Sequence, residues 1–177
     1  MAMIEFPQVS LPALYLPHFG STQHDVLAWH AYFMRKAQLA ALKSKDPSSR
    51  VGAAIADANF RDLGTGYNGF PRGVSDTAVR LAERNVKYRL TLHAEDNALA
   101  FAGRQDLSGC RIYSTHHPCA QCMSRIIQRG LREVFTIAPS AAFAERWGED
   151  LALSREIAQE AGVVITEFHL SPEEQTS

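Results

Sequence analysis

The regular alternation of strand-like and helix-like segments after residue 109 is the feature that most limits the possible folds. Three short strand-like segments are separated by two longer helical ones. In order, the five segments are 110–115, 119–128, 133–138, 142–161 and 163–168. Gly130 and Gly162 close the two helical segments, as glycine often does at helix ends. Helices of this length between strands favour parallel crossovers, so we expect a parallel sheet with helices packed on it.

The first half of the chain predicts an antiparallel addition to this sheet. Segments 51–56 (VGAAIA) and 62–68 (DLGTGYN) flank a short polar turn, which is the pattern of a β-hairpin. We therefore expect a mixed five-stranded sheet with an opening hairpin, in a three-layer α/β/α sandwich. Three more helices are expected: a long one that starts near residue 22 and ends before Pro47, one over 77–87 and one over 93–102.

The length of 177 residues suits one domain that buries a core without disulfide or metal staples. We expect this domain at 22–170, after an extended, proline-containing arm at 1–21 and before a polar tail at 171–177. The 18 basic and 19 acidic residues nearly balance, which argues against long nucleic acid as the main partner.

Three cysteines and the absence of a secretory signal predict a reducing compartment, and we expect a cytoplasmic protein. No run of residues approaches the ~20 apolar positions that a membrane span requires. An odd number of cysteines in such a setting favours thiolate ligands over a disulfide framework.

Two fragments predict a zinc site. Cys119 and Cys122 lie three positions apart at the start of a predicted helix, and His93 opens the preceding one. Both thiolates face one side of the helix, and the helix dipole favours their charge. Helix starts that follow neighbouring strand ends converge at one edge of a sheet. Zinc suits one imidazole and two thiolates, and a fourth position open to water is typical of a catalytic site.

Glu95 lies two positions beyond His93, where its carboxylate can exchange protons with a metal-activated water without binding the metal. The simpler alternative is a helix-start glutamate stabilised by the helix dipole. His116 or His117 remains open as a fourth ligand, although histidines of a loop beside the substrate are the commoner interpretation. Cys110, at the start of a strand, is expected to be a buried thiol.

The pattern H-x-E at 93–95 with P-C-x-x-C at 118–122 is the signature of zinc nucleobase deaminases. The chain resembles the cytidine and deoxycytidylate deaminase superfamily over about 25–168. Four further segments carry the resemblance: SKDPSSRVGAAI (44–55), GTGYNGFPRGVSD (64–76), HAEDNAL (93–99) and IIQRGLREV (126–134).

The resemblance implies a cytidine deaminase-like fold, a Zn2+ cofactor and a small-molecule nucleotide substrate. The implied reaction is hydrolytic deamination of a cytosine nucleotide, most simply dCMP to dUMP and ammonia. One alternative is a related zinc deaminase acting on another nucleobase, modified pyrimidine or nucleoside, including guanine or tRNA adenosine. Another is a zinc module that keeps the metal only for folding. A homo-oligomer, dimer or hexamer, is also implied.

By the same resemblance, Glu95 is the catalytic residue and His93, Cys119 and Cys122 bind zinc. The implied substrate contacts are the side chain of Asn68, the amide of Ala94 and a carbonyl of the loop formed by Thr115, His116 and His117. Asn68 has an alternative explanation, because Asn-Gly is a strong turn signal by itself.

Four residues beside the motif segments are expected to form a pocket for the 5′-phosphate: Lys45, Ser48, Arg50 and Arg72. Ammonium, guanidinium and loop groups are the donors that a phosphate monoester requires. Taken singly, each is also explained as a solvated surface residue. Asp96 differs from the family pattern, which commonly has an apolar or small residue there, and its charge would repel a nearby phosphate.

Overall fold

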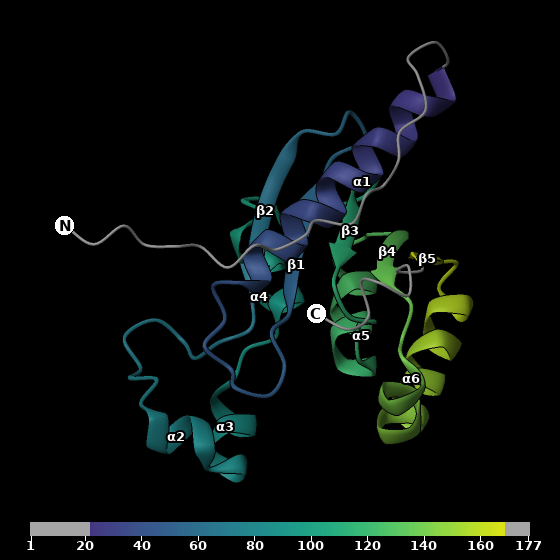
Figure 1. The fold of residues 1–177 in the computed structure, drawn as a ribbon. Coiled ribbons are helices and arrows are strands. Elements are labelled where there is room, and N and C mark those ends of the chain that lie inside the picture. Colours follow the sequence, from purple (N-terminus) through teal and green to yellow (C-terminus); the bar gives the residue numbers. More distant parts are fainter. Residues whose placement is uncertain (1–21, 169–177) are drawn as a thin grey trace, which may run out of the picture.

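A five-stranded sheet runs through the centre of the structure, a computed structural model that describes residues 22–168 (Figure 1). The predicted arm at 1–21 and the predicted tail at 171–177 lie outside the described residues. The strands lie in the order β2-β1-β3-β4-β5. Their bounds are β1 Gly52–Ala56, β2 Asp62–Tyr67, β3 Arg111–Ser114, β4 Glu133–Ile137 and β5 Val164–Phe168.

The pairing of the strands confirms the mixed sheet. β1 runs antiparallel to β2 and to β3, so the hairpin adds two strands to one edge of a parallel unit. β3, β4 and β5 are parallel, as the helical connections between them predict. The chain therefore enters the sheet by a hairpin and completes it by two crossovers.

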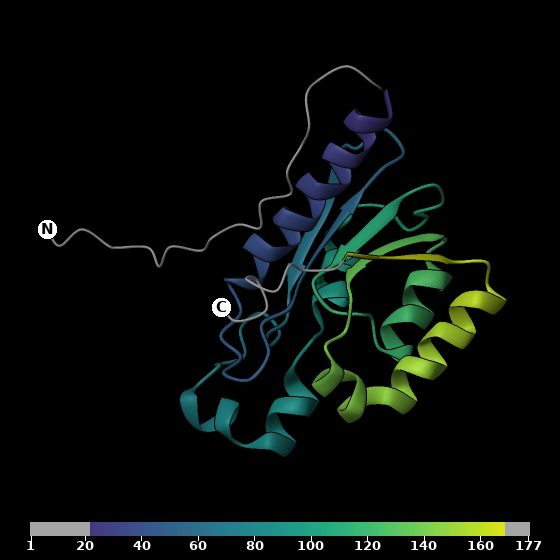
Figure 2. The ribbon, with the colours of Figure 1, turned by 45° about the vertical axis from the view of Figure 1, so that its right-hand side comes forward.

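Helices cover both faces of the sheet, which gives the three predicted layers (Figures 1 and 2). The helices are α1 Thr22–Ala41, α2 Ala78–Ala82, α3 Arg84–Leu90, α4 Ala94–Phe101, α5 Ala120–Gln128 and α6 Ala141–Glu160. Alternate residues of β1 point to opposite layers: Ala53 and Ile55 pack towards α4 and α5, and Ala54 packs towards α1. Within 22–168, no helix has both the length and the apolar character needed to cross a bilayer.

Gly66 of β2 lets α4 lie directly on the sheet. A Cβ atom at this position would come within 2.3 Å of the Ala94 carbonyl oxygen and 2.4 Å of the Ala98 nitrogen. Only a residue without a side chain permits this approach of two backbones. Because Ala94 begins α4, the glycine places the start of this helix against the sheet.

α1 ends at Ala41, before Pro47 as expected, and Asp46 then turns the chain by accepting hydrogen bonds from the amides of Ser48 and Ser49. Two helices differ from the sequence prediction. The helix expected over 77–87 is two short helices, divided at Glu83, which has extended backbone angles. α6 is kinked at Trp147, where φ is −122°.

Candidate active site

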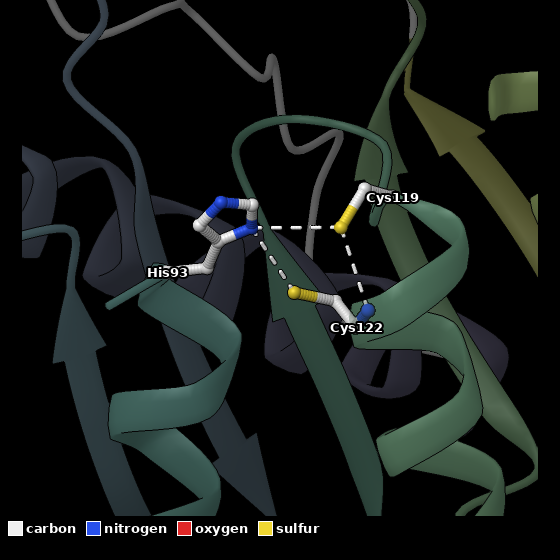
Figure 3. Close-up of side chains that lie close together, drawn as sticks. All are labelled: His93, Cys119 and Cys122. Atoms are coloured by element: carbon white, nitrogen blue, oxygen red, sulfur yellow. Dashed lines mark hydrogen bonds between the residues drawn. The ribbon is translucent and has the colours of Figure 1, made fainter. Parts of the chain in front are cut away.

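His93, Cys119 and Cys122 come together where α4 and α5 begin (Figure 3). His93 is the N-cap of α4, Cys119 is the N-cap of α5, and Cys122 lies in the first turn of α5. The Nδ1 atom of His93 lies 3.2 Å from Cys122 Sγ and 3.5 Å from Cys119 Sγ. One imidazole and two thiols thus surround a single point.

The spacing of these three atoms suits zinc. Bonds of about 2.0–2.1 Å to nitrogen and about 2.3 Å to sulfur, at tetrahedral angles, separate the nitrogen and sulfur ligands by about 3.5 Å. The observed separations of 3.2 and 3.5 Å lie close to this value. Among the described residues, this is the group of histidine, cysteine and acidic side chains that could hold a metal ion, and it includes neither His116 nor His117.

The two helix starts converge by a route that differs from the expected one. α5 does follow the end of β3, through the loop at 115–119. α4 instead follows α3, and two backbone hydrogen bonds between Leu92 and Gly69 attach its start to the chain leaving β2. The prediction that both helices follow neighbouring strand ends is therefore wrong for α4, although the ligands meet.

Hydrogen bonds within the cluster shift the pKa values of Cys119 and His93. The hydrogen bond from the Cys122 thiol is the largest influence lowering the pKa of Cys119 to about 4, and His93 adds a second hydrogen bond. The hydrogen bond to Cys119 raises the pKa of His93 to about 9. The amide of Cys122 also donates to Cys119 Sγ, at 3.4 Å. Zinc binds deprotonated thiols and a neutral imidazole, so metal binding displaces the protons that these three groups carry.

Glu95 lies in the first turn of α4 and is only 3% exposed. Its carboxylate accepts a hydrogen bond of 2.7 Å from the Ser114 hydroxyl at the end of β3. Burial raises the pKa of Glu95, and the hydrogen bond from Ser114 opposes this effect. Ser114 is absent from the sequence prediction, although it shares a strand face with buried Ile112, two residues before it, which packs towards α4.

A cavity of about 370 Å³ opens beside these groups. Several predicted residues line it: Ser48, Asn68, His93, Ala94, Glu95, His116, His117 and Cys119. The side chain of Thr115 is instead buried, and its hydroxyl accepts the Gly52 amide at 3.1 Å. The ring of His117 contacts the Ser154 hydroxyl at 3.4 Å, on α6. The cavity can therefore hold a small molecule next to the three ligands and Glu95.

Residues 27–138 match the family described as the cytidine and deoxycytidylate deaminase zinc-binding region. The chain belongs to this family. The His93, Cys119 and Cys122 cluster falls within the matched residues, and zinc is the cofactor of this deaminase.

Individual relatives agree with this family. A protein of Aliivibrio fischeri named as an uncharacterized deaminase in the luxG 3′ region is 46% identical over 138 residues, 78% of this chain and 92% of its own. The deoxycytidylate deaminase of Mus musculus is 38% identical over 149 residues, 81% of this chain and 82% of its own. The dCMP deaminase of cyanophage S-TIM5, solved with dCMP and dUMP, shares the fold with a TM-score of 0.64 and 24% identity, covering 85% of this chain and all of that one.

Asn68 of the deaminase organises the wall of the cavity. Its side-chain oxygen accepts the Val51 amide at 2.8 Å, and its side-chain nitrogen donates to the Ser49 carbonyl at 2.9 Å. The residue is buried and also lines the cavity. Asn68 thus holds the preceding loop in place, and a substrate contact by the same side chain stays a prediction.

The structure does not bring the four predicted phosphate ligands together. Ser48 lines the cavity, whereas Lys45, Arg50 and Arg72 are not among its lining residues. Lys45 is exposed and pairs with Asp76, and Arg72 packs over the Phe101 ring, 4.7 Å from its centre. The structure therefore does not support a phosphate pocket built from these four side chains, because closeness to the motifs in sequence does not place a side chain in the cavity.

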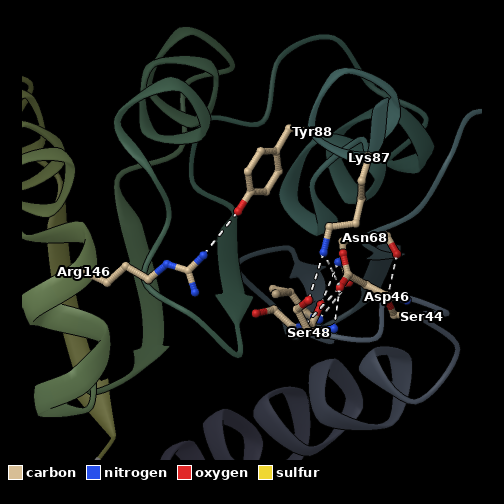
Figure 4. Close-up of polar contacts among 9 residues, drawn as sticks. Ser44, Asp46, Ser48, Asn68, Lys87, Tyr88 and Arg146 are labelled. Carbon is tan, nitrogen blue, oxygen red and sulfur yellow. Dashed lines mark hydrogen bonds and ion pairs between the residues drawn. The ribbon is translucent and has the colours of Figure 1, made fainter. Parts of the chain in front are cut away.

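Two other cations line the cavity of the deaminase (Figure 4). Lys87 of α3 is buried, and its ammonium donates to Asp46 Oδ1 at 3.0 Å and Ser48 Oγ at 3.1 Å. Arg146 of α6 is exposed and donates to the Tyr88 hydroxyl at 3.3 Å. The sequence offers no local signal for either, because α3 and α6 reach the cavity only through the tertiary fold.

Asp96 does not face the cavity. Its carboxylate pairs with Arg125 of α5, and Arg125 Nη1 lies 2.5 Å from Asp96 Oδ2. The expectation that Asp96 repels a bound phosphate is therefore not supported, because Arg125 neutralises the Asp96 charge outside the cavity.

Proposed function

We propose that this protein is a zinc-dependent deaminase that converts dCMP and water to dUMP and ammonia. The observation that carries the proposal is a buried carboxylate, Glu95, held by Ser114 beside a cluster of one imidazole and two thiols in a nucleotide-sized cavity. The deoxycytidylate deaminases among its relatives, such as the mouse protein at 38% identity, support the choice of dCMP.

His93, Cys119 and Cys122 would hold the zinc ion. Zinc at this position supplies Lewis acidity, which makes water nucleophilic at neutral pH. Glu95 takes a proton from the attacking water and delivers it to N3 of the pyrimidine. It then takes the second proton of that water, from the hydroxyl added at C4, and passes it to the amino group, which leaves as ammonia. Ser114 keeps the carboxylate pointed into the site through its 2.7 Å hydrogen bond.

The cytosine end of the substrate would lie against the start of α4. The amide of Ala94 is in the first helical turn, whose N–H groups have no partner within the helix. It is therefore suited to donate a hydrogen bond to the ring carbonyl. A backbone carbonyl of the loop from Thr115 to His117 is suited to accept one from the amino group. These contacts select a ring with the pattern of cytosine.

Arg146 is the residue that we assign to the 5′-phosphate. Lys87 already gives two of its hydrogen bonds to Asp46 and Ser48, and the Asp46 charge offsets its own. Arg146 makes one hydrogen bond, to Tyr88, and a guanidinium has five N–H donors. The remaining donors can bind a phosphate in the bidentate geometry that arginine favours.

The test is ammonia release from dCMP, deoxycytidine, CMP, cytosine, guanine and a short tRNA hairpin. We expect dCMP to have the highest kcat/KM. Arg146→Met should lower kcat/KM for dCMP by about tenfold or more, the effect of losing a hydrogen bond to a charged group, and should hardly change deoxycytidine. Arg72→Met is the matched control, because this exposed arginine lies outside the cavity and should change neither value. Equal kcat/KM for dCMP and deoxycytidine would refute the nucleotide assignment.

We further propose one catalytic domain at 22–170 with an arm and a tail on either side, a homo-oligomeric state (dimer or hexamer) and a cytoplasmic setting. The free Cys110, Cys119 and Cys122 support the reducing setting, because thiolate ligands persist where thiols stay reduced. Light scattering on the intact chain and on a chain without residues 1–21 tests the assembly and the role of the arm.

A further inference from the structure

Asp96 and Arg125 occupy matching positions on the two helices that carry the zinc ligands. Asp96 lies three residues after His93 on α4, and Arg125 lies three residues after Cys122 on α5. Residues three apart share a helix face, so each member of the pair lies one turn below a ligand. Arg125 Nη1 and Asp96 Oδ2 are 2.5 Å apart, which joins α4 to α5 one helical turn beyond the metal ligands.

The surroundings make this pair more than a solvated surface contact. The Asp96 side chain is only 18% exposed, and its Oδ1 atom is buried without a hydrogen-bond partner. The Arg125 side chain, which is 45% exposed, carries the guanidinium paired with this carboxylate. A buried carboxylate without its cation would be costly, so the two helices are held at the separation that keeps the pair intact.

We propose that the Asp96–Arg125 ion pair is a clamp that positions the starts of α4 and α5, so that His93, Cys119 and Cys122 are already close together before zinc binds. Neither residue lines the cavity or belongs to the group of metal ligands. The inference rests on the proposed assignment of zinc to these three ligands. It gives Asp96 a role, namely to set the geometry of the ligand cluster from outside the cavity.

A clamp and a simple charge effect predict different signs. Asp96→Asn removes a negative charge near the metal, and Arg125→Met removes a positive one. If the pair acted only through the field at the zinc ion, the first variant would weaken zinc binding and the second would strengthen it. If the pair acts as a clamp, both variants remove the same contact between α4 and α5, and both speed zinc release.

The experiment measures zinc release from the intact, zinc-loaded protein to a chromogenic chelator in excess. We expect Asp96→Asn and Arg125→Met each to release zinc about two- to fivefold faster, the range for a partly exposed ion pair. The double variant should release zinc no faster than the single variants, because either single change already removes the Asp96–Arg125 ion pair. Opposite signs for the two singles, additive effects in the double variant or wild-type rates would overturn the clamp.

Lys36→Met is the matched control. It breaks an ion pair between Lys36 of α1 and Asp62 of β2, on the other side of the sheet from the zinc site, and should leave zinc release unchanged. Arg125→Gln, which also removes the charge, replaces Arg125→Met if that variant does not fold; faster release from it supports the clamp, and a wild-type rate counts against it. Failure of the wild-type protein to bind zinc through His93, Cys119 and Cys122 would refute the site assignment, a result distinct from failure of the clamp.

Discussion

At the scale of single residues, burial separates the two explanations of Glu95. A glutamate that only stabilises a helix start can interact with the helix dipole while it stays at the surface and hydrated. Glu95 is instead 3% exposed, and a buried carboxylate has a free-energy cost that only specific partners offset. The hydroxyl of Ser114 is such a partner, at 2.7 Å. Its burial beside the ligand cluster therefore favours a role in proton transfer.

Glu95→Gln tests this role. The amide keeps the shape of the side chain and can still accept a hydrogen bond from Ser114, but it cannot carry a proton. We expect kcat for dCMP to fall by about 10²- to 10⁴-fold, the usual effect of losing a general acid and base. Zinc content, by elemental analysis, should stay near one per chain. Glu133→Gln makes the same chemical change on β4, remote from the cavity, and a comparable loss there would contradict the assignment.

At the scale of elements, one carboxylate joins α3 to the loop after α1. Asp46 accepts the amides of Ser48 and Ser49 and the ammonium of Lys87 (Figure 4). Asn68 binds the other side of the same loop through Ser49 and Val51. The loop that forms one wall of the cavity is thus held by hydrogen bonds to Asp46 and to Asn68.

The pH dependence of stability tests the contribution of the Asp46 contacts. Burial opposes ionisation of Asp46, but hydrogen bonds from Ser48, Lys87 and Ser49 outweigh it, so the pKa of Asp46 is lowered. A carboxyl with a lowered folded pKa stabilises the fold above its unfolded pKa, about 3.9, and loses this contribution as the pH falls through the folded value. Asp46→Asn should therefore cost about 3 kcal/mol of unfolding free energy at pH 7, and less with each step below pH 4.

Urea unfolding of the wild-type and Asp46→Asn proteins at pH 7, 5, 4 and 3 measures this difference. Asp76→Asn is the control, because Asp76 pairs with Lys45, which is 68% exposed, and such pairs contribute about 1 kcal/mol or less. A stability difference for Asp46→Asn that did not shrink towards acid pH would show that the charge of Asp46 does not matter.

At the scale of the whole molecule, the two apolar clusters of the core do not include the three metal ligands. One apolar cluster lies between the sheet and the layer of α4, α5 and α6, and a second lies between the sheet and α1. Both contain fully buried side chains, such as Ile55 and Leu107 in the first. A chain of this size buries enough apolar surface to fold without a metal. We therefore expect the fold to form without zinc.

Metal removal tests this expectation. After treatment with a chelator, we expect the protein to keep its far-UV circular dichroism and to unfold cooperatively at a lower Tm, because zinc binds the folded state alone. Returning zinc should restore the original Tm and the deaminase activity together. Loss of secondary structure in the metal-free protein would instead indicate a site on which folding depends, as in zinc fingers.

The sequence by itself determined the features that depend on neighbouring residues, namely the strands, most of the helices and the spacing of the two thiols. Alternating segments predicted the mixed sheet and most of its helices, and the spacing of Cys119 and Cys122 predicted two thiols on one face of a helix start. Tertiary structure alone decided the partners that come from distant segments. Ser114 meets Glu95, Lys87 and Arg146 reach the cavity from α3 and α6, and Asp96 finds Arg125. The physical reason is that periodicity and capping act over a few residues, whereas a side chain's charged partner depends on how whole elements pack.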